Sequence, residues 1–238
     1  MSVINLRALE PFSEADPIAR LKALRAVMAE KYPAAEVKPA GIFATGLKEV
    51  DATEGGLRRG AVTELVGPVS AGALFTAGLL LALEAQGVFG ALIDAGSFFD
   101  PQGADPLTLP RLLWVRCAEV MAAVKAADIL LRDGNLPVVL LDLQGASLRE
   151  VRRVPASTWH RFQRLAEPGG TAFVVLSNQP VVEGAQVRIA MRQRWTLEAM
   201  RWRRSQLLAE VEAQVFTRRD FSQMAPERAG RTQNSVCG

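Results

Sequence analysis

The sequence predicts an α/β protein built on a mostly parallel central sheet with helices on both faces. Near-continuous apolar runs of strand length alternate with helix-like segments, as expected when strands are covered on both faces. Glycines such as Gly87 and Gly134 stand where helices would end before the next strand. A length of 238 residues with 49% hydrophobic residues suits one substantial domain of this class.

The expected elements follow one another in a regular order. Strands are predicted at Ala61–Val66, Phe89–Ile93, Leu112–Val115, Pro137–Leu143 and Thr171–Leu176. Helices are predicted at Ala73–Gln86, Ala118–Arg132 and Ala156–Ala166. A further alternating strand runs from Val187 to Arg194. Because sites in such sheets lie at the carboxyl ends of the strands, Gly67–Gly72, Asp94, Asp142 and Asn178-Gln179 are expected to converge on one edge.

Three parts are expected along the chain. Residues 1–40 form a helical appendage, because Asp16-Pro17 starts a helix and apolar residues recur at near-helical spacing up to Tyr32. Residues 41–198 form the core. Residues 199–238 form a basic C-terminal helix and a mobile tail beginning near Arg218. The predicted helix combines basic and apolar residues: Arg201, Arg203, Arg204, Leu207, Leu208, Val211 and Val215.

Composition excludes several classes of function. Two cysteines, Cys117 and Cys237, are too few for a disulfide framework, and one histidine, His160, argues against histidine-based metal sites or triads. We expect no cofactor. The start of the chain lacks a signal pattern, and the longest apolar stretch ends at Glu84, so a soluble cytoplasmic protein without a membrane span is expected. From Arg188 onward ten arginines face five acidic residues, which favours an acidic partner or a solvated basic surface.

The segment from Gly67 to Leu74 has the frame of a phosphate-binding loop, G-x-x-x-x-G-K-[ST], between an expected strand and an expected helix. Ala73 stands in place of the lysine that reaches the phosphates, and Leu74 in place of the hydroxyl that holds Mg²⁺. With both groups absent, ordinary Mg-ATP hydrolysis is not expected. The alternative is a strand-to-helix turn that happens to contain glycines.

The segments around this loop resemble the ATPase core of the RecA recombinase family. The resemblance spans Gly41 to Arg194 and depends on ordered segments: Thr45-Gly46, Gly55-Gly56-Leu57, Gly60, the loop itself, Asp94-Ala95-Gly96 and Asp100-Pro101. It implies that Gly96 replaces the catalytic glutamate and that Asp142 matches the acid of the second nucleotide motif. Asp142 could equally be an ordinary polar residue at a strand end. It also implies that Gln179, after Asn178, matches a nucleotide sensor that leads into a DNA-binding loop.

These positions together define a degenerate nucleotide site, which comprises Gly67, Pro68, Ser70, Gly72, Ala73, Leu74, Gly96, Asp142 and Gln179. The segment Pro180–Gln186 that would grip DNA contains no lysine or arginine. The segment Gln144–Pro155 carries Arg149, Arg152 and Arg153, which would either contact phosphates or be solvated. The predicted C-terminal helix would either dock on a partner or pack on its own sheet.

One branch of the family, the ImuA-type proteins, is similar to this chain beyond the sheet. The similarity lies in Trp159–Ala166, Gly169-Gly170 and the basic strand Val187–Arg194. It implies a non-catalytic accessory role in SOS-induced mutagenesis and translesion DNA synthesis. The implied partners are a RecA filament, an inactive Y-family polymerase-like protein and an error-prone C-family polymerase. The alternatives are a SulA-like cell-division inhibitor, a RecA-like ATPase with nonstandard groups, and a direct DNA-binding protein.

Overall fold

The structure is a computed structural model that describes residues 41–191, 196, 198–218 and 220–221. The chain divides into two units, Met1–Glu36 and Val37–Gly238, and every described residue belongs to the second. The expected helical appendage, including Asp16–Tyr32, lies outside the described residues. Nearly all of the expected tail after Arg218 lies outside them as well.

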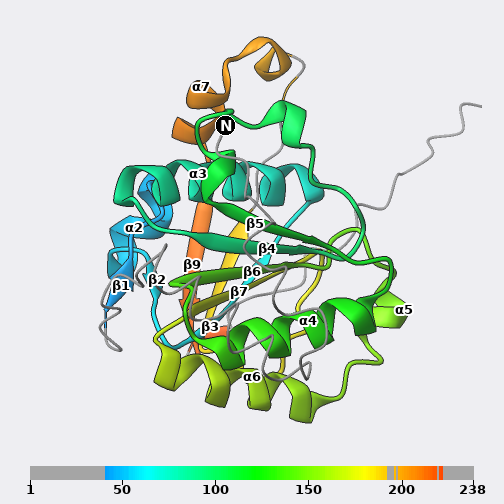
Figure 1. The fold of residues 1–238 in the computed structure, drawn as a ribbon. Helices are drawn as coiled ribbons and strands as arrows, with labels where there is room; N and C mark the ends of the chain where they lie inside the picture. The colour runs from blue at the N-terminus through cyan, green and yellow to red at the C-terminus, as the bar shows by residue number, and fades with distance from the viewer. Residues whose placement is uncertain (1–40, 192–195, 197, 219, 222–238) are drawn as a thin grey trace, which may run out of the picture. The chain divides into compact units, whose positions relative to one another are not determined.

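A seven-stranded sheet organises the second unit (Figure 1). Its strands are β3 (Val62–Val66), β4 (Gly90–Asp94), β5 (Leu112–Arg116), β6 (Val138–Asp142), β7 (Ala172–Ser177), β8 (Val187–Met191) and β9 (Ala213–Thr217). They lie in the order β5-β4-β6-β7-β3-β8-β9, and every pair is parallel except β8 and β9. The predicted α/β class, the five core strands and the strand from Val187 are confirmed.

Helices cover both faces of this sheet (Figure 1). One face carries α3 (Val69–Gln86) and α2 (Lys48–Glu54), and the other carries α4 (Val120–Asp133) and α6 (Ala156–Gly169). The remaining described elements are short. Two are the helices α5 (Leu148–Val151) and α7 (Arg204–Ala209), and three are 3₁₀ turns (Pro101–Gly103, Leu109–Arg111, Ala199–Arg201). The last is a small antiparallel pair of strands, β1 (Ile42–Phe43) with β2 (Leu57–Arg58).

Two apolar cores follow from the alternation of side chains along each strand. Leu140 and Val174 pack on the α3 side, whereas their neighbours Val139 and Phe173 pack on the side of α4 and α6. Burial on both faces explains why these strands read as continuous apolar runs. Helix α3 is long and apolar enough to cross a membrane by length and composition alone, but it is mostly buried against the sheet, as the core helix of a soluble protein would be.

The predicted C-terminal helix is wrong beyond residue 209. Helix α7 ends at Ala209, Val211 is buried in the following connection, and Val215 lies on strand β9. Strand β9 pairs with β8, so it satisfies backbone groups that would otherwise form an open sheet edge. The residues Leu207, Leu208, Val211 and Val215 therefore do not form one helical face. All four belong to or pack against the core on the α3 side.

Candidate functional site

The carboxyl edge of the sheet brings together the segments that the sequence placed there. Strands β3, β7, β6 and β4 are consecutive neighbours in the sheet, so their carboxyl ends meet. In the register of the sheet, Asp94 lies opposite Asp142 and Val66 opposite Ser177. The start of α3, the two aspartates and Asn178 thus share one edge, and the expected convergence is confirmed.

The expected phosphate loop does not form a loop. Helix α3 begins at Val69, so only Gly67 and Pro68 separate it from β3, and the amides of Ala71 and Gly72 already bond to the carbonyl of Pro68. A phosphate cradle needs free amides that wrap around the anion. Ser70 and Ala73 are exposed on this helix, whereas Leu74 is only 8% exposed and belongs to the core.

Gln144 fills the space in front of this turn. Its side chain is buried, and its Nε2 donates to the carbonyls of Gly67 (2.8 Å) and Pro68 (3.3 Å). A Cβ atom on Gly72 would lie 1.9 Å from Gln144 Oε1, so any larger residue at position 72 would force the glutamine side chain to move. Sequence reasoning missed Gln144, because no local pattern shows that residues 72 positions apart will touch.

Of the two aspartates on this edge, Asp94 is buried and Asp142 is half-buried. Burial raises the pKa of Asp142 to about 6; a hydrogen bond from the amide of Gln144 (2.9 Å) opposes this shift, and the charge of Asp94 adds to it. Within the described part of the chain, no group of three or more His, Cys, Asp or Glu residues could hold a metal ion. Asp142 accordingly has one acidic neighbour and no ligand set around it.

Asp94 organises the turn that follows β4. Its carboxylate is 1% exposed and accepts from the amides of Gly96, Phe98 and Phe99 and from the Nε1 of Trp114. The ring of Phe98 lies over Gly96 and Gly145: a Cβ on Gly96 would come within 2.6 Å of the ring, and one on Gly145 within 2.0 Å. A glutamate at residue 96 would therefore displace Phe98. The sequence gives no short-range sign of this contact.

The connection from β7 to β8 is fixed by a buried ion pair that the sequence analysis did not identify. Glu64 on β3 is fully buried and accepts from the amides of Val181 (2.6 Å) and Val182 (2.9 Å). Arg188 on β8 donates to Glu64 (2.7 Å) and to the carbonyl of Val182 (3.0 Å). The sequence feature that could have predicted this ion pair is Glu64 itself, a charged residue in the middle of an otherwise largely apolar strand. Gln179, just before this connection, is exposed.

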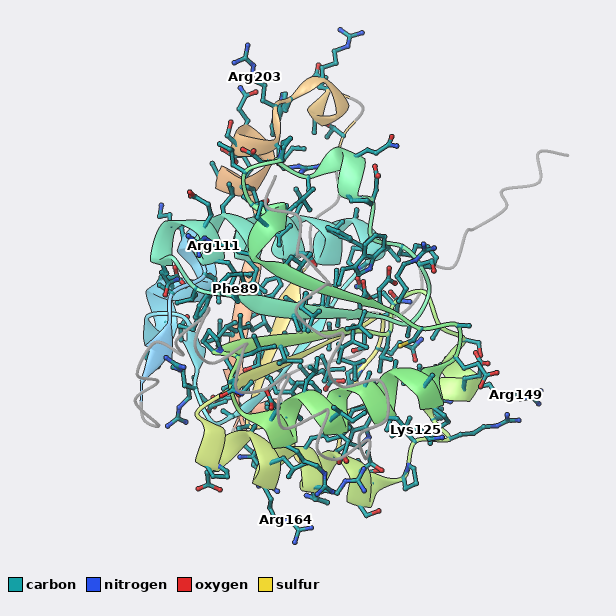
Figure 2. All side chains as sticks on the ribbon, viewed as in Figure 1. Phe89, Arg111, Lys125, Arg149, Arg164 and Arg203 are labelled. Atoms are coloured by element: carbon teal, nitrogen blue, oxygen red, sulfur yellow. The ribbon has the colours of Figure 1, made fainter. Side chains whose placement is uncertain are left out.

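The arginines singled out from the sequence lie on separate elements. Arg149, Arg152 and Arg153 are exposed at α5, which a capping box between Ser147 and Glu150 starts. A second exposed group lies at the 3₁₀ turn before α7 and at α7 itself: Arg201, Arg203 and Arg204. Figure 2 shows Arg149 and Arg203 at different ends of the described unit, each pointing outward. The structure does not bring the two groups together.

No protein-family model matches this chain. At the carboxyl edge, the side chains of Gln144 and Phe98 lie against the turns that follow β3 and β4.

Proposed function

We propose that this chain is a non-catalytic, RecA-like accessory protein of SOS-induced translesion DNA synthesis. It acts in the cytoplasm through contacts with a RecA filament or with the polymerases of a mutasome. The sheet and the helices on both its faces are compatible with a RecA-like core. In such a protein the fold serves as a scaffold, and the binding surfaces carry the function.

Gln144 is the observation that carries the non-catalytic part of this proposal. A nucleotide phosphate at the start of α3 would have to displace a buried glutamine that holds two backbone carbonyls. The lysine and the hydroxyl whose contacts with phosphate and Mg²⁺ would offset the cost of that displacement are absent, since Ala73 and Leu74 occupy their positions. The buried Gln144 and the missing lysine and hydroxyl favour a protein that acts through binding surfaces over an ATPase with nonstandard groups.

Titration calorimetry with Mg-ATP and Mg-ADP, together with a turnover assay, tests the non-catalytic part. We expect no heat of binding and no phosphate release. The triple substitution Ala73→Lys, Leu74→Thr and Gly96→Glu should also fail to bind nucleotide, because Gln144 still lies against the start of α3 and a glutamate at residue 96 must first displace Phe98. Turnover by the natural chain would contradict the proposal.

Partner capture tests the accessory role. The tagged full chain should co-elute with RecA or with mutasome polymerases after DNA damage, and an untreated culture serves as the control. Co-elution with the tubulin-like division protein instead would favour a SulA-like inhibitor. Direct DNA binding through Arg149, Arg152 and Arg153 predicts an affinity for oligonucleotides that falls steeply with salt.

A further inference from the structure

One exposed aromatic side chain on the carboxyl edge stands on a backbone turn that a buried carboxylate fixes. Phe98 is 54% exposed, yet its amide and the amides of Gly96 and Phe99 are all bound by the buried carboxylate of Asp94. One edge of its ring rests against Gly96 and Gly145, where any Cβ atom would collide with it. Because this turn is already ordered, a partner that binds to Phe98 pays a smaller cost in conformational entropy for ordering it.

The backbone beside Phe98 is in a costly conformation. Ser97 has φ 55°, and it is the one non-glycine residue with positive φ in the described part of the chain. A left-handed conformation costs a non-glycine residue on the order of 1 kcal/mol. The amides on either side of Ser97, those of Gly96 and Phe98, are both bound to Asp94.

An arginine is fixed next to this turn. The guanidinium of Arg116 lies over the ring of Trp114, 5.1 Å from its centroid, and its Nη2 lies 3.5 Å from Ser97 Oγ. Trp114 is in turn fixed by its bond to Asp94 (3.3 Å) and by edge-to-face packing with Phe99 (5.3 Å). Among the described residues, no carboxylate lies within ion-pair distance of Arg116.

We propose that Phe98 and Arg116 form a docking pair for a protein segment that carries one acidic residue close to an apolar one. The segment places a carboxylate on the Arg116 guanidinium and an apolar side chain on Phe98. Fixed aromatic and arginine side chains are the residues that dominate binding at protein interfaces, and guanidinium groups bind carboxylates through paired hydrogen bonds. The inference rests on the proposed binding role and names the surface and the chemistry of the partner.

The charges around the pair favour a peptide over a nucleic acid. Two exposed acids, Asp100 and Glu119, flank Phe98 and Arg116 in the chain. A nucleic acid needs a track of cations for successive phosphates, and these carboxylates would repel it as they would repel a segment with several acidic residues. A single carboxylate beside an apolar side chain requires only the one guanidinium.

Selection of peptides on the purified full chain tests this pair directly. A library of random dodecapeptides is selected on the immobilised protein, and enriched sequences are resynthesised for fluorescence anisotropy. We expect an Asp or Glu close to a large apolar residue in the enriched peptides. Their affinity should fall at least about tenfold in Phe98→Ala and in Arg116→Gln. Arg116→Lys should lose part of the affinity, because it keeps the charge but not the planar fork.

Ile129→Ala and Lys125→Gln are matched controls, since both residues are exposed on α4 and neither belongs to the pair. Unchanged thermal midpoints would show that every variant is folded. Equal affinities in all variants, or selected peptides without acidic residues, would overturn the inference. So would a single-stranded oligothymidylate that binds through Phe98. Partner capture with the natural chain is a separate measurement, so either proposal can fail alone.

Discussion

At the scale of single residues, several positions that resemble a nucleotide site make packing contacts within the chain. Gly72 accommodates Gln144, Gly96 accommodates Phe98, and Leu74 fills the core. Two of the three departures from an active ATPase pattern, Leu74 and Gly96, are therefore explained by a contact within the chain, whereas Ala73 is exposed. Restoring the hydroxyl at residue 74 or the glutamate at residue 96 would break such a contact before it restored any chemistry.

The contact between Gly72 and Gln144 predicts a strong coupling. Gly72→Ala should destabilise the protein by about 1–3 kcal/mol, because Gln144 must abandon its bonds to Gly67 and Pro68 to make room. In a Gln144→Ala background the same change should be neutral or stabilise by up to about 1 kcal/mol, since alanine favours the helix. A double-mutant cycle by urea unfolding measures the difference. Additive effects would contradict the contact.

The raised pKa of Asp142 predicts a pH dependence of stability. The folded state holds the proton more tightly than the unfolded state, because the pKa rises from 3.8 to about 6. This contribution is complete below about pH 4 and is lost as the pH rises through about 6, which costs roughly 2–3 kcal/mol. Asp142→Asn should flatten the profile between pH 4 and 6 and stabilise the protein at pH 7.5. Urea unfolding at both ends of the range provides the test, and parallel profiles for the two proteins would refute it.

At the scale of elements, the ion pair of Glu64 and Arg188 fixes the connection between β7 and β8. Arg188→Met should cost about 3–5 kcal/mol, because it leaves a buried carboxylate without its cation. The amides of Val181 and Val182 should then exchange hydrogen faster. Arg164→Met on α6 is the control, since Arg164 is exposed and points away from the protein in Figure 2, and it should change stability by less than about 0.5 kcal/mol. Unchanged exchange at Val181 and Val182 would mean that the ion pair does not hold the connection.

Elements whose burial is visible in the local sequence were predictable. Strands β3 to β7 match the expected runs within one or two residues. Burial on both faces makes β4, β6 and β7 almost continuously apolar, whereas β3 also carries Glu64 and β5 is a half-exposed edge strand. Strand β9 was mistaken for helix, since spacings of three and four residues among Leu208, Val211 and Val215 fit a helix as well. The contacts of Gln144 and Phe98 could not be foreseen, because they join residues that meet only once the sheet has formed.

At the scale of the whole molecule, the C-terminal part belongs to the described core. Strand β9 covers β8, and Val211 and Phe216 are each 4% exposed. A chain that ends at Glu210 should lose soluble yield and thermal stability, because it uncovers the edge of β8. A chain that ends at Phe221 keeps β9 and should melt at a higher temperature than the one that ends at Glu210, and thermal melts compare the two. Deleting residues 200–238 would remove β9 as well as any binding surface, so a loss of partner binding could come from misfolding. Substitutions at Trp202 or Arg203 avoid this problem, because neither residue lies in the sheet. Equal melting of the two shortened chains would contradict the role of β9.

The position of β3 in the sheet also has a consequence for synthesis on the ribosome. It is the first strand of the sheet to be made, yet both of its neighbours, β7 and β8, come more than 100 residues later. At 5–20 residues per second, β3 waits on the order of ten seconds for a partner. The nascent chain exposes an apolar strand throughout that interval. Chaperone capture or aggregation during translation should therefore act on this chain before its sheet can close.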